Sequence, residues 1–180
     1  MSDHGIVTEA GTVRFERQLR APPERVWDYL TRSELRRQWF AEGEMELHPG
    51  GAVTLVFRNS ELSPGGEEVP EKFRPYEGYV SKGEIVQIEP PRLLVFNWFE
   101  ESGPATEVSW ELEARGEETL LVLTHRRLPN RAMLVDVSGG WHVHLDVLED
   151  VLADRTPRPF WSTNSRYAEE YEQRIPADAS

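Results

Sequence analysis

The segment EVSWELEA, residues 107–114, is the feature that most constrains the fold of this chain. Its valine, tryptophan and leucine alternate with polar residues, which predicts a strand with one apolar face and one wet face. A turn signal, ARGEE at 114–118, and a second apolar segment, TLLVLTHRRL at 119–128, complete a predicted β-hairpin. An antiparallel sheet of this kind must cover its apolar face with another layer, so we expect a helix to lie against it.

Four other segments have the composition of strands, being rich in β-branched and aromatic residues and bounded by Gly or Pro. They are TVRFERQLR at 12–20, AVTLVFR at 52–58, YEGYVSKGEIVQI at 76–88 and RLLVFNWF at 92–99.

Two short helices are predicted after the first strand. In APPERVWDYL, residues 21–30, the two prolines suit the first turn of a helix, and an apolar stripe follows them. The spacing of Thr31 and Glu34 is that of a capping box, which would open a second helix running through Trp39. A polar loop fits that second segment equally well.

The hydrophobic period changes near the C-terminus. Gly139-Gly140 marks the predicted start of a long helix, with Ser138 as a possible N-cap. The helical stripe that follows consists of Trp141, Leu145, Leu148 and Leu152, at positions i, i+4, i+7 and i+11.

The predicted helix determines whether His142 and His144 could bind one metal ion together. Residues two apart on a helix point roughly 200° away from each other, so these histidines are not expected to share a metal ion. His144 is predicted on the buried side, and His142 on the wet side, one turn from Asp146. The chain has five scattered histidines, and its sequence contains no HxxxH or HExxH motif, so no metal site is expected. The carboxylates expected to be solvated on the polar face are Glu149, Asp150 and Asp154.

We place the main body of the domain at residues 11–155, with one segment expected on either side of it and one long loop within it. Residues 1–10 are interpreted as a flexible leader. Residues 156–180 are interpreted as a C-terminal extension with a short helix that docks aromatic residues, such as Tyr167 and Tyr171, onto the body. The polar, Pro- and Gly-rich loop at 59–76 is long for a compact domain and is predicted to fold over a cavity mouth. Its deletion is expected to change ligand access more than stability.

Composition limits the classes of function. The formal net charge of −12 repels phosphate backbones, so nucleic-acid binding is not expected. The densest basic cluster, Arg32 with Arg36 and Arg37, is interpreted as a solvated helix face. The chain has no cysteine, no segment typical of a signal peptide and no apolar run of membrane-spanning length, so we expect a cytoplasmic protein that does not bind membranes.

The sequence resembles the SRPBCC (START-like) superfamily, and within it the Aha-type branch, which is named for activators of the heat-shock chaperone ATPase. The resemblance runs from about Val13 to Leu152. Its motifs are RAPPERVWDYLT, LRRQWF, GEIVQIEPPRLLVFNW, TLLVLTHRRLP and GGWHVHLDVLEDVL. It implies an α+β helix-grip fold, in which a curved antiparallel sheet of about six or seven strands wraps around a long C-terminal helix, with two short helices after the first strand.

One long helix cannot fill the concave side of a strongly curved sheet, so a mostly apolar cavity is expected beneath it. Each candidate lining residue could equally belong to an ordinary core. The candidates are Phe57, Val80, Phe96, Trp98, Trp110, Leu123, His125, Trp141, His144 and Leu148.

Three functions remain open at this point. The first is binding of a small hydrophobic ligand in the cavity, with no cofactor. The second is an enzyme of the polyketide-cyclase or hydrolase kind known in the superfamily, with His125 or His144 transferring a proton; a half-buried histidine bonded to the backbone is the simpler reading of either. The third is a co-chaperone-like regulator, although such regulators carry an additional N-terminal domain that ten leader residues would not supply. The sequence does not distinguish a monomer from a homodimer.

Overall fold

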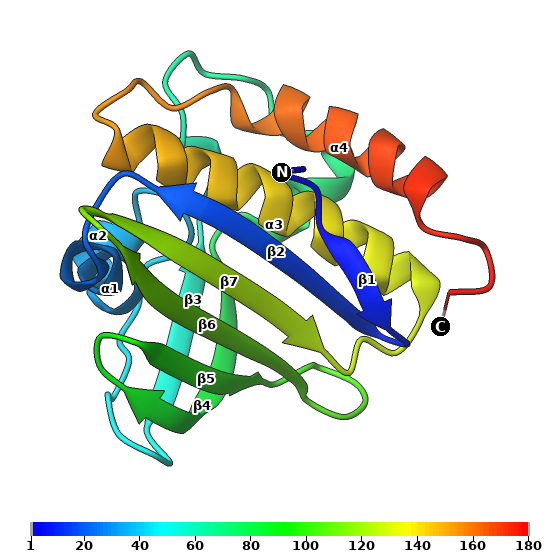
Figure 1. Cartoon of the computed structure of the whole chain (residues 1–180). Helices are drawn as coiled ribbons and strands as arrows, with labels where there is room; N and C mark the ends of the chain where they lie inside the picture. The colour runs from blue at the N-terminus through cyan, green and yellow to red at the C-terminus, as the bar shows by residue number, and fades with distance from the viewer. Residues whose placement is uncertain (1, 180) are drawn as a thin grey trace.

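A computed structural model of the chain describes residues 2–179 and contains one curved antiparallel sheet (Figure 1). Its seven strands follow the order β1-β2-β7-β6-β5-β4-β3, and every neighbouring pair is antiparallel. The strands are β1 (Ile6–Glu9), β2 (Thr12–Leu19), β3 (Ala52–Phe57), β4 (Tyr79–Glu89), β5 (Leu93–Trp98), β6 (Thr106–Arg115) and β7 (Glu118–Arg126).

The helices lie at one end and on one face of this sheet. Two short helices, α1 (Pro23–Thr31) and α2 (Ser33–Arg36), follow β2, as expected from the sequence. The long helix α3 (Arg131–Leu152) crosses the concave face, and α4 (Phe160–Arg174) lies along the side of α3 away from the sheet (Figure 1). Two 3-10 helices, η1 (Asn59–Glu61) and η2 (Glu71–Tyr76), lie in the long loop between β3 and β4. The α+β helix-grip architecture is therefore confirmed.

The N-terminal segment differs from the expected leader. Residues Ile6–Glu9 form β1, which pairs with β2 at the sheet edge. The preceding Gly5 donates its N–H to the hydroxyl of Tyr171 on α4, at 2.7 Å. The prediction of a flexible leader was wrong for this segment, because a short edge strand without alternation has no clear signal of its own.

The long helix begins at Arg131, before the Gly139-Gly140 pair that was predicted to mark its start. Asn130 is its N-cap, and its side chain accepts the N–H of Met133 at 2.9 Å. Ser138 is no cap, since its hydroxyl donates to the carbonyl of Leu134 inside the helix. Gly139 lies where α4 crosses, so a Cβ there would meet the backbone of Ala168 at 3.5 Å. The glycine pair therefore lies inside the helix and does not mark its start, with Gly139 at the contact with α4.

The helix α4 covers the face of α3 that was expected to be wet. His142 is buried and stacks on Tyr167, with ring centroids 3.7 Å apart. Asp146 and Asp150 are also buried and accept hydrogen bonds from Arg158, at 2.9 and 2.8 Å. The predictions of a solvated His142 and Asp150 were wrong, because the docking of α4 puts these polar groups into an interface. Asp154 is exposed and Glu149 is partly exposed.

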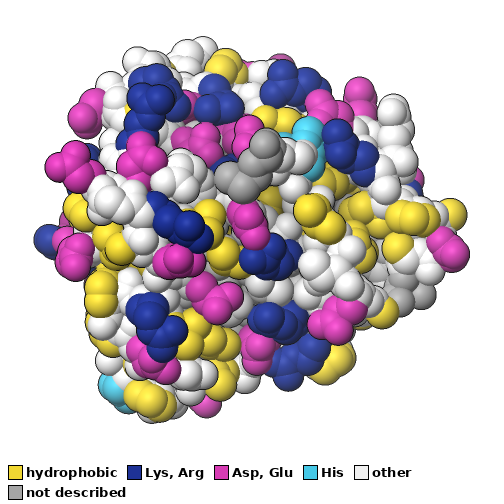
Figure 2. All heavy atoms as spheres, in the orientation of Figure 1, with side chains coloured by type: hydrophobic (Ala, Val, Ile, Leu, Met, Phe, Trp, Pro, Cys, Tyr) yellow, Lys and Arg dark blue, Asp and Glu magenta, His cyan; other side chains and the backbone are white. Residues whose placement is uncertain are grey.

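The prediction that Arg32, Arg36 and Arg37 form a solvated helix face was wrong for one of the three. Arg36 is fully buried, with 0% of its surface exposed, whereas Arg32 and Arg37 are exposed. Its guanidinium donates to the backbone carbonyls of Leu30, Thr31 and Ala41 at 3.2, 3.1 and 3.0 Å, and also to that of Gly43. Arg36 therefore ties the end of α1 to the segment that leads into β3. On the face shown in Figure 2, basic and acidic side chains are interspersed, without a large basic patch.

Among residues 2–179, no helix is long and apolar enough to cross a lipid bilayer.

Candidate ligand pocket

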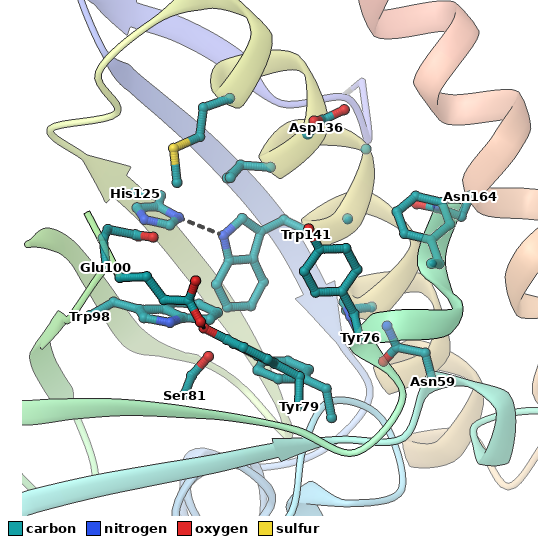
Figure 3. Close-up of a pocket in the computed structure, with 18 of the residues that line it drawn as sticks. Asn59, Tyr76, Tyr79, Ser81, Trp98, Glu100, His125, Asp136, Trp141 and Asn164 are labelled. Carbon is teal, nitrogen blue, oxygen red and sulfur yellow. Dashed lines mark hydrogen bonds between the residues drawn. The ribbon is translucent and has the colours of Figure 1, made fainter. Parts of the chain in front are cut away.

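A pocket of about 740 Å³ lies between the concave face of the sheet, α3, α4 and the loop of residues 59–76. Much of its wall is aromatic, and polar side chains converge on it from several elements (Figure 3). The aromatic lining residues are Phe40, Phe57, Phe73, Tyr76, Tyr79, Trp98, Phe99, Trp141, Phe160 and Trp161. This size and lining are typical of small-molecule sites.

One face of α3 forms a wall of the pocket. Met133, Val137, Gly140 and His144 lie at i, i+4, i+7 and i+11 and all line the pocket, as one helical stripe should. Gly140 is the gap in this stripe. A Cβ at Gly140 would meet nothing within 4 Å, so the missing side chain adds open space to the pocket.

The loop of residues 59–76 and α4 close one side of the pocket together. Phe73 of η2 stacks on Trp161 of α4, with centroids 5.1 Å apart. The carboxylate of Glu67 accepts the N–H groups of Trp161 and Ser162 at 2.9 and 3.2 Å, so the loop supplies a cap for the first turn of α4. The loop therefore contributes lining residues to the pocket, among them Phe73 and Tyr76, and it also braces α4.

A layer of stacked rings forms the sheet side of the pocket. Trp98 lies between Phe57 and His125, with centroids 5.8 Å from each and interplanar angles of 3° and 8°. Trp141 of α3 stacks on Phe40 at 4.9 Å. These contacts fix the orientation of the rings and leave apolar faces along the pocket.

A hydrogen-bonded chain fixes His125 on β7. The indole N–H of Trp141 donates to its Nδ1 at 3.0 Å, so the proton of the neutral ring lies on Nε2, which is 2.9 Å from the hydroxyl of Thr106. That hydroxyl donates to Oε1 of Glu100 at 3.3 Å. Burial lowers the pKa of His125 to about 3. Both ring nitrogens of His125 are engaged, which leaves no lone pair for proton transfer to a substrate.

Only one ring nitrogen of His144, on α3, forms a hydrogen bond with a described residue. Its Nδ1 donates to the carbonyl of Trp39 at 2.8 Å, which places the lone pair on Nε2. Nε2 makes no hydrogen bond to any described residue, and the ring lines the pocket while only 6% of the residue is exposed. Burial lowers the pKa of His144 to about 4, so the ring is neutral near pH 7 and offers an acceptor. Of the two histidines, only His144 remains a candidate for proton transfer, and as a weak base.

All but one of the residues expected to line the cavity fall into two groups. Phe57, Trp98, His125, Trp141 and His144 line the pocket. A second group lies behind it in the fully buried core, namely Phe96, Trp110, Leu123 and Leu148.

Val80 was wrongly placed among the lining residues, since it lies on the outer face of β4 with 47% of its surface exposed. Its neighbours Tyr79 and Ser81 line the pocket instead. Lys82 and Glu84 lie two and four residues after Val80, so all three side chains point to the same face of β4. The two charged residues mark this face in the sequence as the outer one. Several lining residues from loops and α4 were not predicted, since no local pattern indicates that those segments meet here.

Across residues 2–179, no group of His, Asp or Glu side chains is arranged to hold a metal ion.

Comparison with known proteins gives both a family and related structures. The family model described as Activator of Hsp90 ATPase homolog 1-like protein matches residues 20–153. Comparison with curated proteins gave no match. The solution structure of a Bordetella parapertussis protein, encoded by gene BPP1335, is 39% identical, with a TM-score of 0.82 over 99% of this chain and 93% of that one.

Two more distant structures share the fold. The crystal structure of CalU16 from Micromonospora echinospora is 26% identical, with a TM-score of 0.67 over 90% of this chain and 86% of that one. The solution structure of the Aha1 dimer from Colwellia psychrerythraea is 18% identical, with a TM-score of 0.58 over 78% of this chain and 95% of that one.

Proposed function

The chain belongs to the family of Activator of Hsp90 ATPase homolog 1-like proteins, and on that basis we propose that it binds a small, mainly apolar molecule in the pocket beneath α3. The observation that carries this proposal is the concave space of about 740 Å³ between the sheet, α3, α4 and the loop of residues 59–76. A concave, mostly apolar cleft of this size with a few polar groups is the usual form of a small-molecule site.

Exposed aromatic side chains at the pocket mouth support the same proposal. Tyr76 and Phe99 both line the pocket, and 58% and 48% of their surfaces are exposed. Exposed large aromatic rings beside a cavity are typical of a binding surface, because a bound apolar molecule would cover them and remove their area from water.

Filling the pocket from within tests this proposal. In the variant Gly140→Phe, the new ring extends from the pocket-facing stripe of α3 into open space, so it occupies the volume that a ligand needs. We expect the affinity for Nile red, an uncharged apolar dye, to fall at least about tenfold, which corresponds to ~1.4 kcal/mol. Fluorescence titration of the dye measures this change.

The matched control is Gly140→Ala, which adds a methyl group and leaves most of the pocket open. A helical Gly→Ala replacement is expected to raise the free energy of unfolding by about 0.5–1 kcal/mol. Dye affinity should then stay close to that of the unchanged protein. If the Phe and Ala variants bound the dye with equal affinity, the site of binding would lie elsewhere.

A further inference from the structure

The polar part of the pocket is predominantly acidic. Glu100, Glu101 and Asp136 line it, and Lys72 is the single Lys or Arg among the lining residues of the described chain. None of these three carboxylates forms an ion pair within 4.0 Å with any residue that the structure describes. Lys72 is exposed and lies over the ring of Phe73 at 4.7 Å. The pocket therefore holds an excess of negative charge that the protein itself does not neutralise.

Glu100 is the carboxylate that joins the hydrogen-bonded chain of Trp141, His125 and Thr106. It follows β5 two residues after Trp98, is partly buried, and accepts one long hydrogen bond of 3.3 Å, from Thr106. Its burial raises the pKa of its carboxyl. Asp136 faces the pocket from α3, on the helix side, whereas Glu100 lies on the sheet side near His125 (Figure 3). Burial raises the pKa of Asp136 also. Glu100 has therefore lost part of its hydration without an ion-pair partner, whereas Asp136 is exposed and the charge of Lys72 acts against the rise in its pKa.

The remaining lining groups suit a ligand that donates hydrogen bonds and carries positive charge. The ring faces of Trp141 and Tyr79, which line the pocket, attract a cation through their quadrupoles. His144, more than nine-tenths buried, presents the lone pair of Nε2 with no hydrogen-bond partner among the described residues. The hydroxyl of Tyr79 donates to Glu101 at 2.9 Å, so what the carboxylates lack is a cation and not every donor. Two independent features, carboxylates without an ion pair and an imidazole acceptor without a hydrogen bond, thus suit the same group, a cationic donor.

We propose that the molecule bound in this pocket is an amine, with an apolar or aromatic body held by the stacked rings and a protonated nitrogen beside Glu100. This inference rests on the proposed ligand-binding function and adds the charge of the ligand to it. A ligand carboxylate of the same shape would be repelled by the three acidic side chains, and a neutral ligand would leave them unpaired.

Three compounds of nearly equal shape test the charge preference. They are 2-naphthylmethylamine, 2-naphthalenemethanol and 2-naphthoic acid, titrated into the unmodified protein by isothermal calorimetry at pH 7. We expect the amine to bind at least about tenfold more tightly than the alcohol, and the acid to bind most weakly of the three. The proposal is overturned if the alcohol or the acid binds as tightly as the amine, or if none of the three binds.

The same measurements separate the two proposals. If Nile red binds and Gly140→Phe weakens it while the three naphthyl compounds show no preference for the amine, only the charge preference fails. If neither the dye nor any naphthyl compound binds, the pocket function fails as well.

A charge-neutralising variant locates the preference. Glu100→Gln is expected to weaken binding of the amine about tenfold and to leave binding of the alcohol unchanged. The matched control is Glu111→Gln, which removes the same charge from the exposed outer face of β6, away from the pocket. The double variant Glu100→Gln/Asp136→Asn should remove the amine preference altogether. Equal amine binding by the double variant and the Glu111→Gln control would overturn the assignment of these carboxylates.

Discussion

Replacing Arg36 by methionine is expected to lower the free energy of unfolding by about 3–5 kcal/mol, the scale for breaking a buried charged network. The guanidinium of Arg36 serves four backbone carbonyls, those of Leu30, Thr31, Ala41 and Gly43. Methionine fills a similar volume but donates no hydrogen bond, so these carbonyls would lose their buried donor. Each unsatisfied buried group costs about 1–3 kcal/mol.

Urea denaturation followed by circular dichroism measures this loss, and the adjacent residue supplies the control. Arg37 is exposed, and its guanidinium lies 3.9 Å from the equally exposed carboxylate of Glu61. The variant Arg37→Met should therefore change stability by no more than about 0.5 kcal/mol. Similar losses for the two variants would show that the hydrogen bonds of Arg36 are not what holds α1 to β3.

Acidification from pH 7 to pH 5 is expected to lower the free energy of unfolding by roughly 3 kcal/mol. Burial lowers the pKa of His125 to about 3 and that of His144 to about 4. For His142, burial and then the charges of Arg17, His4, Arg158 and Arg166 lower the pKa to about 2.

The direction follows from proton uptake. Below pH ~6.5 the unfolded chain protonates all three histidines while the folded chain keeps them neutral, so each loses about 2 kcal/mol of stabilisation by pH 5. Glu149 opposes this loss, because burial raises its pKa to about 7, and the folded state binds its proton before the unfolded state does. That gain is about 2 kcal/mol over the same interval, so the histidines outweigh it.

Urea unfolding at pH 7 and pH 5 measures the difference. In the variant His144→Leu, one of the three histidine contributions disappears, and the loss on acidification should shrink by about 2 kcal/mol. A free energy of unfolding that stayed constant or rose on acidification would contradict the buried, neutral state of these side chains.

Much of the fold could be predicted because each strand and helix carries a local pattern. The alternation at 107–114 and the stripe Trp141 to Leu152 each reflect one apolar face, and both elements lie where that pattern places them. Elements without such a pattern were missed. The strand Ile6–Glu9 forms by pairing with β2, and the first turns of α3 precede a Gly-Gly pair that resembles a helix start.

The pocket was harder to predict because its composition depends on tertiary contacts. Its aromatic back wall, with Trp98, Trp141 and His144, follows from strand and helix periodicity. Lining residues such as Glu100 and Trp161 come from a loop and from α4, whose positions no local pattern specifies. Arg36 shows the same limit, since an arginine is seldom fully buried and only its four carbonyl partners explain why it is.

The hydrogen bonds along Trp141, His125 and Thr106 divide the pocket into two parts with different tolerance of change. These hydrogen bonds hold the edges of the inner rings. A ligand whose shape does not fit the rings would therefore have to distort the hydrogen bonds. The rim, formed by loop 59–76 and the segment after β5, is built largely from exposed side chains. Substitutions at the rim would therefore change which ligands bind, while the inner wall and the stability that it provides stay the same.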